Sequence, residues 1–201
     1  LDGEWAFYPD TLANEQELKT SETSSFVHVP GDWNKGRAHE VKSSFGNGTY
    51  RLRILLDRPL AAPLSFWVQE IQSATTVDIN GETVASMGRT GETGQASYQP
   101  NRTSFVVDYV PDREARELDL VIRVANYEHP YMGGISKPIK LGSHQAIQDE
   151  YGVSVDLQQI TFVVLMLHGL YACILYLFNP RERSLLDFFL LLVSAALSVV
   201  T

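Results

Sequence analysis

Hydrophobic and polar residues alternate along much of the first 145 residues of the chain. In the stretch TYRLRILL, Tyr50, Leu52 and Ile54 alternate with Arg51 and Arg53. The stretch ELDLVIRV, at 117–124, repeats the pattern and confines its charged side chains to one face. A period of two marks a β-strand with one buried face and one solvent-exposed face. Both stretches are therefore predicted strands.

Other short segments extend this β-rich pattern. The stretch TTVDINGETVASMG predicts a β-hairpin, because Asn80-Gly81 favours a tight two-residue turn between β-rich arms. Further strands are expected at 4–8, 26–29, 64–69, 105–109 and 138–141, and one short helix at 11–18. Short strands separated by turn signals are typical of an antiparallel sandwich or jelly roll. The expected fold class is mainly β, an antiparallel jelly-roll β-sandwich.

Near residue 156 the alternation gives way to two long apolar runs. Residues 160–178 hold one ionisable side chain, His168, and a second run begins at 185 and is still apolar at Thr201. A 19-residue helix measures about 28 Å, close to the hydrocarbon thickness of a bilayer. We expect transmembrane α-helices at about 159–178 and 185–201, with the second continuing beyond the sequence. The alternative is a buried helical hairpin of a soluble protein.

The short segment between the two runs predicts their orientation. Asn179-Pro180 ends the first helix, and Arg181 and Arg183 are the basic residues nearest to either run. Basic loops tend to stay in the cytoplasm. We therefore expect this loop inside and residues 1 to about 155 outside the cell membrane.

Composition separates an acidic body from an apolar tail. Of the formal charge of −8, residues 1–155 carry 14 Lys and Arg against 21 Asp and Glu, a net of 14 − 21 = −7. This balance argues against nucleic-acid binding. The single cysteine, Cys173, lies in an apolar run, so no disulfide or thiolate metal site is expected. We expect a body at 1–142, a connector at 143–158 that can run helically into the first span, the membrane portion at 159–201, and a segment preceding Leu1.

Sequence signatures of catalysis are missing. The chain contains no G-x-S-x-G, H-E-x-x-H, P-loop or dinucleotide-binding pattern. The histidines of the body, His28, His39, His129 and His144, have no metal-ligand spacing. We therefore expect no catalytic residues, no metal and no cofactor, and hence no enzyme in this segment.

Several motifs of the body resemble a known family. LDGEWAFYPD, VPGDWN and GNGTYRLRI resemble the opening of galactose-binding-like jelly rolls, including the sugar-binding domain of large β-glycosidases. TVDINGETVASMG resembles the hairpin of the same family. The resemblance covers most of residues 1–142 and implies a fold more than a ligand.

The tail resembles a second group of proteins. HGLYACILYLFNPRERSLLDFFLLL resembles the first two membrane helices of bacterial seven-transmembrane receptors with diverse intracellular signalling modules. NYEHPYMGGISKPIKLG resembles the end of their extracytoplasmic domain. The resemblance implies the bacterial inner membrane, a periplasmic body, five further helices and a cytoplasmic output domain such as a cyclase or histidine kinase.

Five residues are candidates for ligand binding. Trp67 shares a strand face with Gln69, opposite the hydrophobic neighbours on either side of it, and would offer an aromatic platform to a sugar. The alternative is that Trp67 packs under a loop or the other sheet. His129 and Tyr131 lie in the loop NYEHPYMGG, which would bind a ligand, the membrane surface or other receptor helices. Arg89, in GRTGETG, would meet an anionic ligand or remain a solvated surface arginine.

Together these features predict the sensory input portion of a membrane signalling receptor. The expected partners are the lipid bilayer and a small extracytoplasmic ligand, with a carbohydrate as the first candidate. The open alternative is an interaction or dimerisation module that senses no small ligand, and a homodimer would fit it. An accessory domain of a membrane-anchored glycosidase is disfavoured, because the chain enters the membrane where a catalytic domain would be needed.

Overall fold

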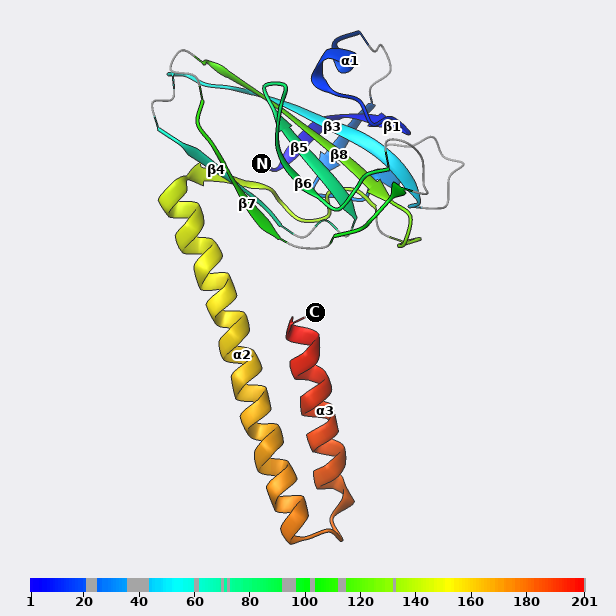
Figure 1. The fold of residues 1–201 in the computed structure, drawn as a ribbon, viewed down its shortest axis with the longest axis vertical. Coiled ribbons are helices and arrows are strands. Elements are labelled where there is room, and N and C mark those ends of the chain that lie inside the picture. The colour runs from blue at the N-terminus through cyan, green and yellow to red at the C-terminus, as the bar shows by residue number, and fades with distance from the viewer. Residues whose placement is uncertain are drawn as a thin grey trace. The chain divides into compact units, whose positions relative to one another are not determined.

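The computed structural model describes residues 1–20, 25–35, 44–59, 62–69, 71, 73–91, 97–101, 104–111, 115–131 and 133–200. The chain forms two compact units, Leu1–Ile147 and Gln148–Thr201. The first unit is built of β-strands and the second of helices (Figure 1).

The described part of the first unit contains nine strands, one short α-helix and one 3₁₀ turn before the long helix α2 begins. In chain order these elements are β1 (Gly3–Pro9), α1 (Glu15–Thr20), β2 (Ser25–Val29), the 3₁₀ turn (Trp33–Lys35), β3 (Gly46–Leu55), β4 (Leu64–Val68), β5 (Ala74–Ile79), β6 (Glu82–Met87), β7 (Phe105–Tyr109), β8 (Glu117–Asn126) and β9 (Lys140–Ser143). The predicted strands are therefore present, although β9 begins two residues later than expected.

These strands form two antiparallel sheets, as the alternating pattern predicted. Within the described residues, the larger sheet has six strands in the order β2-β1-β3-β8-β5-β6, and the smaller has three in the order β7-β4-β9. The β3 and β8 strands pair along their full length, from Gly46 opposite Asn126 to Leu55 opposite Glu117. They form the centre of the larger sheet (Figure 1).

The hydrophobic core lies between the inward faces of the two sheets. Tyr50 on β3 and Leu120 and Ile122 on β8 are fully buried, and Phe66 on β4 belongs to the same cluster. Burying each such side chain contributes about 1.5–3 kcal/mol. The residues between them along β3 and β8 therefore point to the outer face of the larger sheet.

The β5–β6 turn is fixed to the neighbouring strand by its own polar side chain. Asn80 and Gly81 both have positive φ, 51° and 81°, which a tight hairpin turn of this kind requires. The Asn80 Oδ1 accepts a hydrogen bond from the Asp119 backbone N–H at 2.8 Å, and the Asn80 N–H donates to the Asp119 carbonyl at 2.9 Å. The turn thus becomes a rigid border of the outer face of the larger sheet.

The second unit is a pair of helices. The α2 helix (His144–Phe178) runs without a break through the region expected to be a connector, and α3 is Arg183–Val200. Among the described residues, α2 is the one helix long and apolar enough to cross a membrane, with a mean hydropathy of 2.1 over an 18-residue stretch. Gly169 of α2 lies close to α3, because a Cβ placed there would be 3.7 Å from Leu192 and Phe189.

Candidate functional site

The outer face of the six-stranded sheet carries three ion pairs along β8. Arg51 binds Asp119 through two nitrogens, with Nε at 2.9 Å from Oδ1 and Nη2 at 2.5 Å from Oδ2. Arg53 Nη2 lies 2.6 Å from Glu117. Further along the strand, Arg123 Nη2 lies 3.0 Å from an oxygen of Asp78 on β5, which is the third pair.

The Arg51–Asp119 pair is largely removed from solvent. The two side chains are 15% and 7% exposed, whereas those of Arg53 and Glu117 are 59% and 40% exposed. The hydrogen bond that Arg51 donates to Asp119 raises the pKa of Arg51 above its ordinary value, although burial acts in the opposite direction. Arg51 is therefore a permanent cation whose charge Asp119 neutralises.

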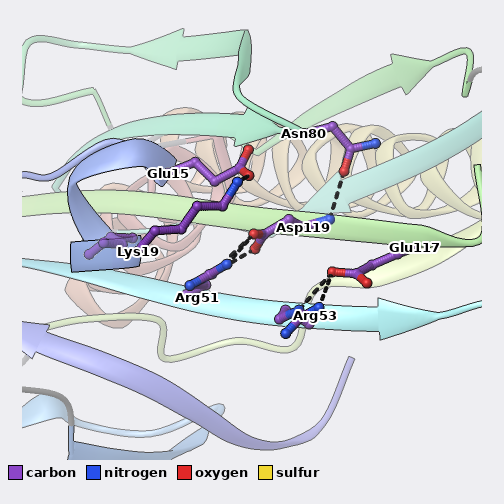
Figure 2. Close-up of a pocket in the computed structure, with 8 residues that line it drawn as sticks. Glu15, Lys19, Arg51, Arg53, Asn80, Glu117 and Asp119 are labelled. Carbon is purple, nitrogen blue, oxygen red and sulfur yellow. Dashed lines mark hydrogen bonds and ion pairs between the residues drawn. The ribbon is translucent and has the colours of Figure 1, made fainter. Parts of the chain in front are cut away.

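The first pocket on this face, the α1 pocket, lies between the short helix and β3, β8 and the hairpin turn (Figure 2). Its volume is about 530 Å³. Its charged lining residues are Glu15, Lys19, Arg51, Arg53, Glu117 and Asp119, joined by Leu18 and Asn80. Each of these charges has an opposite partner, since Lys19 Nζ lies 2.5 Å from Glu15 and the other four form the pairs described above. The pocket is polar but neutral.

A smaller pocket of about 260 Å³ adjoins the α1 pocket and shares Arg51 and Arg53 with it. Phe26 of β2 stands at its rim with 70% of its surface exposed. An exposed aromatic ring beside converging polar groups is the usual composition of a sugar site. The exposure of Phe26 could have been predicted from the sequence, because the alternation in β2 turns Val27 and Val29 inward and leaves Phe26 outside.

The second large pocket, the hydroxyl pocket, lies over β5, β6 and β8 and has a volume of about 610 Å³. It is lined by five hydroxyl side chains and two arginines: Thr76, Thr83, Ser86, Thr90 and Ser97, with Arg89 and Arg123. None of these lining residues is a carboxylate. Arg89, a residue that the sequence singled out, is exposed here and has no ion-pair partner among the described residues.

Trp67 lies on the opposite side of the sandwich from these pockets. Phe66 and Val68 are in the core and Trp67 faces outward from β4, as predicted, but only 6% of its surface is exposed. The Lys140 ammonium lies 4.8 Å from the ring centroid. Gln69 is half-buried and follows the last residue of β4. Trp67 is thus covered rather than displayed as a platform, and its role in binding stays a prediction.

His129 and Tyr131 lie together in the loop after β8. Asn126 holds this loop, because its Nδ2 donates to the His129 carbonyl at 2.8 Å and its Oδ1 accepts from the His129 N–H at 3.0 Å. His129 is half-buried, while Tyr131 is 86% exposed. The Gly-Gly that follows is a packing feature, since a Cβ on Gly133 would collide with the indole of Trp33. The five predicted residues are therefore not gathered into one site.

A different polar cluster lies where α2 leaves the smaller sheet. Asp108 of β7 accepts hydrogen bonds from Ser65 Oγ and from His144 Nδ1, the latter at 2.9 Å. The hydrogen bond from Ser65 has the largest effect on the pKa of Asp108, and together with that from His144 it holds this pKa below its ordinary value. Ile147 is buried against Gly142 of β9. The first turn of α2 is thus fastened to the outer face of this sheet.

The chain matches no protein-family model and no curated protein. Its fold is similar to solved glycosidase structures. One is a glycosyl hydrolase family 2 member from Bacteroides cellulosilyticus DSM 14838, with 20% identity and a TM-score of 0.53 over 70% of this chain and 20% of that chain. A β-glycosidase from Bacteroides vulgatus has 17% identity and a TM-score of 0.51 over 71% of this chain and 19% of that chain. A β-glucuronidase from an uncultured Clostridium sp. has 16% identity and a TM-score of 0.51 over 70% of this chain and 28% of that chain.

The chain therefore spans between about a fifth and somewhat more than a quarter of the length of these enzymes. At this identity the likeness concerns the fold alone. The first unit is an antiparallel β-sandwich similar to the sandwich domains of family 2 glycosidases.

Proposed function

We propose that this chain is the sensory input portion of a bacterial seven-transmembrane receptor with diverse intracellular signalling modules. Its galactose-binding-like jelly roll binds a small extracytoplasmic ligand, a carbohydrate, without turning it over. The observation that carries the proposal is the direct junction between sandwich and helix, because β9 ends at Ser143 and α2 begins at His144. Because the smaller sheet continues into the first turn of α2 without an intervening loop, we expect a change in the sheet to be passed to the helix.

The surface of the helices supports a location in the bacterial inner membrane. Leu167, Leu170, Leu177 and Phe178 of α2 are each more than half exposed, and Leu191 of α3 is equally exposed. Soluble proteins rarely display such a continuous apolar surface to water. Lipid chains would cover it, and the helical backbone satisfies its own hydrogen bonds within the bilayer.

The junction supplies a route for the signal. The His144–Asp108 bond and the contact between Ile147 and Gly142 join the first turn of α2 to β7 and β9. A ligand transmits a signal only if it binds one arrangement of this junction more tightly than the other. The mechanism therefore requires that sugar binding on the sandwich and the position of α2 be thermodynamically coupled.

A carbohydrate is the favoured ligand because of the chemistry of the outer face of the six-stranded sheet. Exposed Phe26 offers a ring for stacking, and Arg51 and Arg53 beside it carry N–H donors in fixed positions. Sugars are recognised by this combination of aromatic surface and converging polar groups. The fold shared with glycosidase sandwich domains is consistent with this ligand class.

The test is a thermal-shift screen of the whole chain in lipid nanodiscs against mono- and oligosaccharides, nucleotides and amino acids. A ligand present at a hundred times its Kd should stabilise the folded state by about 2.7 kcal/mol. A sugar that raises the Tm of the wild type, and raises it less in Phe26→Ala, is the expected result. A chain that ignores the whole panel but forms a stable dimer would instead favour the interaction-module alternative.

A further inference from the structure

We propose that the hydroxyl pocket binds a sugar that carries a carboxylate, with Arg89 pairing with the carboxylate and the pocket hydroxyls with the hydroxyls of the sugar. This inference rests on the proposed carbohydrate-binding function. It goes beyond that function by adding a second site, which shares no lining residue with the pocket at Phe26, and by naming an acidic sugar as its ligand class and Arg89 as the residue that selects it.

Charge separates the hydroxyl pocket from the α1 pocket. In the α1 pocket every charged lining residue is already paired. In the hydroxyl pocket Arg123 is neutralised by Asp78, which also accepts a 2.7 Å hydrogen bond from Thr83. This leaves Arg89 as the lining charge without a partner in the described part of the chain. An anionic ligand would neutralise this charge, whereas a neutral ligand could accept hydrogen bonds from Arg89 but would leave the charge uncompensated.

The backbone presents Arg89 in a fixed position. Its N–H and carbonyl form two hydrogen bonds with Gln99, at 2.7 and 3.0 Å. The preceding Gly88 has a φ of 72°, and a Cβ there would collide with the Gln99 carbonyl. Only glycine therefore permits this close approach. A guanidinium on so restrained a backbone can pair with both oxygens of a carboxylate at little further cost in backbone entropy.

The remaining lining groups match the rest of a sugar. Each hydroxyl of Thr76, Ser86 and Thr90 can donate one hydrogen bond and accept others, as each hydroxyl of a sugar does. Thr76 and Ser86 lie 3.5 Å apart, a weak contact that a ligand hydroxyl can replace. A volume of about 610 Å³ accommodates a mono- or disaccharide, whereas a single inorganic anion would leave most of the pocket to water.

The test compares D-glucuronate with D-glucose, which differ only at the carboxylate carbon, and with inorganic phosphate. Binding of each to the whole chain in nanodiscs is measured by calorimetry at low and high salt. We expect glucuronate to bind at least tenfold more tightly than glucose, and less tightly at high salt. Arg89→Gln should weaken glucuronate binding roughly ten- to a hundredfold and leave glucose unchanged. Arg58→Gln, the same change on an exposed arginine outside the pocket, should have no effect.

A second variant guards against an indirect effect of Arg89→Gln. Ser86→Asp replaces one pocket hydroxyl with a carboxylate on the exposed rim of the same pocket, so charge repulsion should weaken glucuronate binding by a much larger factor than it weakens glucose binding. Equal binding of glucose and glucuronate would overturn this inference and leave carbohydrate sensing intact. Phosphate binding as tight as that of glucuronate would also overturn it, because the pocket would then be a general anion site. If none of the three probes binds but a neutral sugar raises the Tm in the thermal-shift screen, the proposal of an acidic ligand is overturned and the proposal of carbohydrate sensing stands.

Discussion

Arg51 and Arg53 lie two residues apart on β3 and point to the same side of the sheet, yet their ion pairs differ in exposure. Arg51→Ala would leave the buried carboxylate of Asp119 without its cation, which should lower the free energy of unfolding by about 3–5 kcal/mol. Arg53→Ala breaks an exposed pair and should cost less than about 1 kcal/mol. Urea unfolding followed by tryptophan fluorescence measures both. Equal losses in the two variants would contradict this difference in burial.

Asp108 should make the free energy of unfolding of the sandwich depend on pH in the acidic range. Its pKa is lowered in the folded state, so its contribution is complete above the ordinary carboxyl pKa of about 3.9 and is lost as the pH falls through the folded value. Ser65→Ala removes the largest cause, and should raise the pKa of Asp108 towards its ordinary value and flatten the loss of stability below about pH 4. NMR titration of the carboxyl carbon measures the shift. An Asp108 titration unchanged in Ser65→Ala would contradict the assignment.

Trp67 marks the limit of what the sequence predicts at the scale of a residue. The period of two placed it correctly on the face opposite Phe66 and Val68. The solvent exposure of the Trp67 ring depends on Lys140, which belongs to the last strand of the sandwich and lies over the ring. Such long-range cover leaves no signal near Trp67 in the sequence. Phe26, by contrast, was recoverable, since the alternation in β2 turns it outward.

Capping explains where the helices differ from expectation. The α1 helix was predicted at 11–18 but begins at Glu15, because Asn14 Oδ1 accepts hydrogen bonds from the N–H groups of Gln16 and Glu17, each at 3.0 Å. The Glu17 carboxylate in turn accepts a hydrogen bond from the Asn14 N–H at 2.9 Å. This Asn-x-x-Glu capping box is visible in the sequence, so the boundary was predictable. The connector was expected to be able to run helically into the first span, and α2 does begin at His144, although its polar first turns gave no signal for that exact boundary.

The close approach of α2 and α3 at Gly169 allows a test of the helical hairpin. A Cβ there meets Leu192 and Phe189 at 3.7 Å, an ordinary contact distance, so Gly169→Ala should keep the packing. Gly169→Leu should force the helices apart, since small residues permit close helix packing in membranes. We expect a lower Tm in detergent for Gly169→Leu alone.

The matched control is Gly152→Leu, at a position of α2 where a Cβ meets nothing within 4 Å. It changes the same residue type to the same bulk and should leave the Tm nearly unchanged, apart from the effect of helix propensity. If the two leucine variants melt alike, α2 and α3 do not pack through Gly169.

For the whole molecule, the sequence predicts the fold class better than it predicts the site. Several short alternating strands separated by turn signals predicted an antiparallel sandwich, and the alternation in β3 placed Arg51 and Arg53 on the outer face. The hydroxyl pocket joins Thr76, Ser86 and Arg123 across three strands with Arg89 beyond them. Its composition follows from strand order and from the bridge between Arg89 and Gln99, which no local pattern encodes. The proposed acidic-sugar site therefore depends on strand pairings that the sequence alone leaves open.

The proposed receptor requires the sandwich and the α2–α3 loop to lie on opposite sides of the membrane. Arg181 and Arg183 favour a cytoplasmic loop. In a Cys173→Ser background, Ala62→Cys on the sandwich should react with a membrane-impermeant maleimide in intact bacterial cells. Ser184→Cys, which is also exposed, should react only after permeabilisation. Labelling of Ser184→Cys alone in intact cells would reverse the orientation, so that the pockets would face the cytoplasm and extracytoplasmic sensing would have to be abandoned. Labelling of both sites in intact cells would mean that α2 does not cross the membrane.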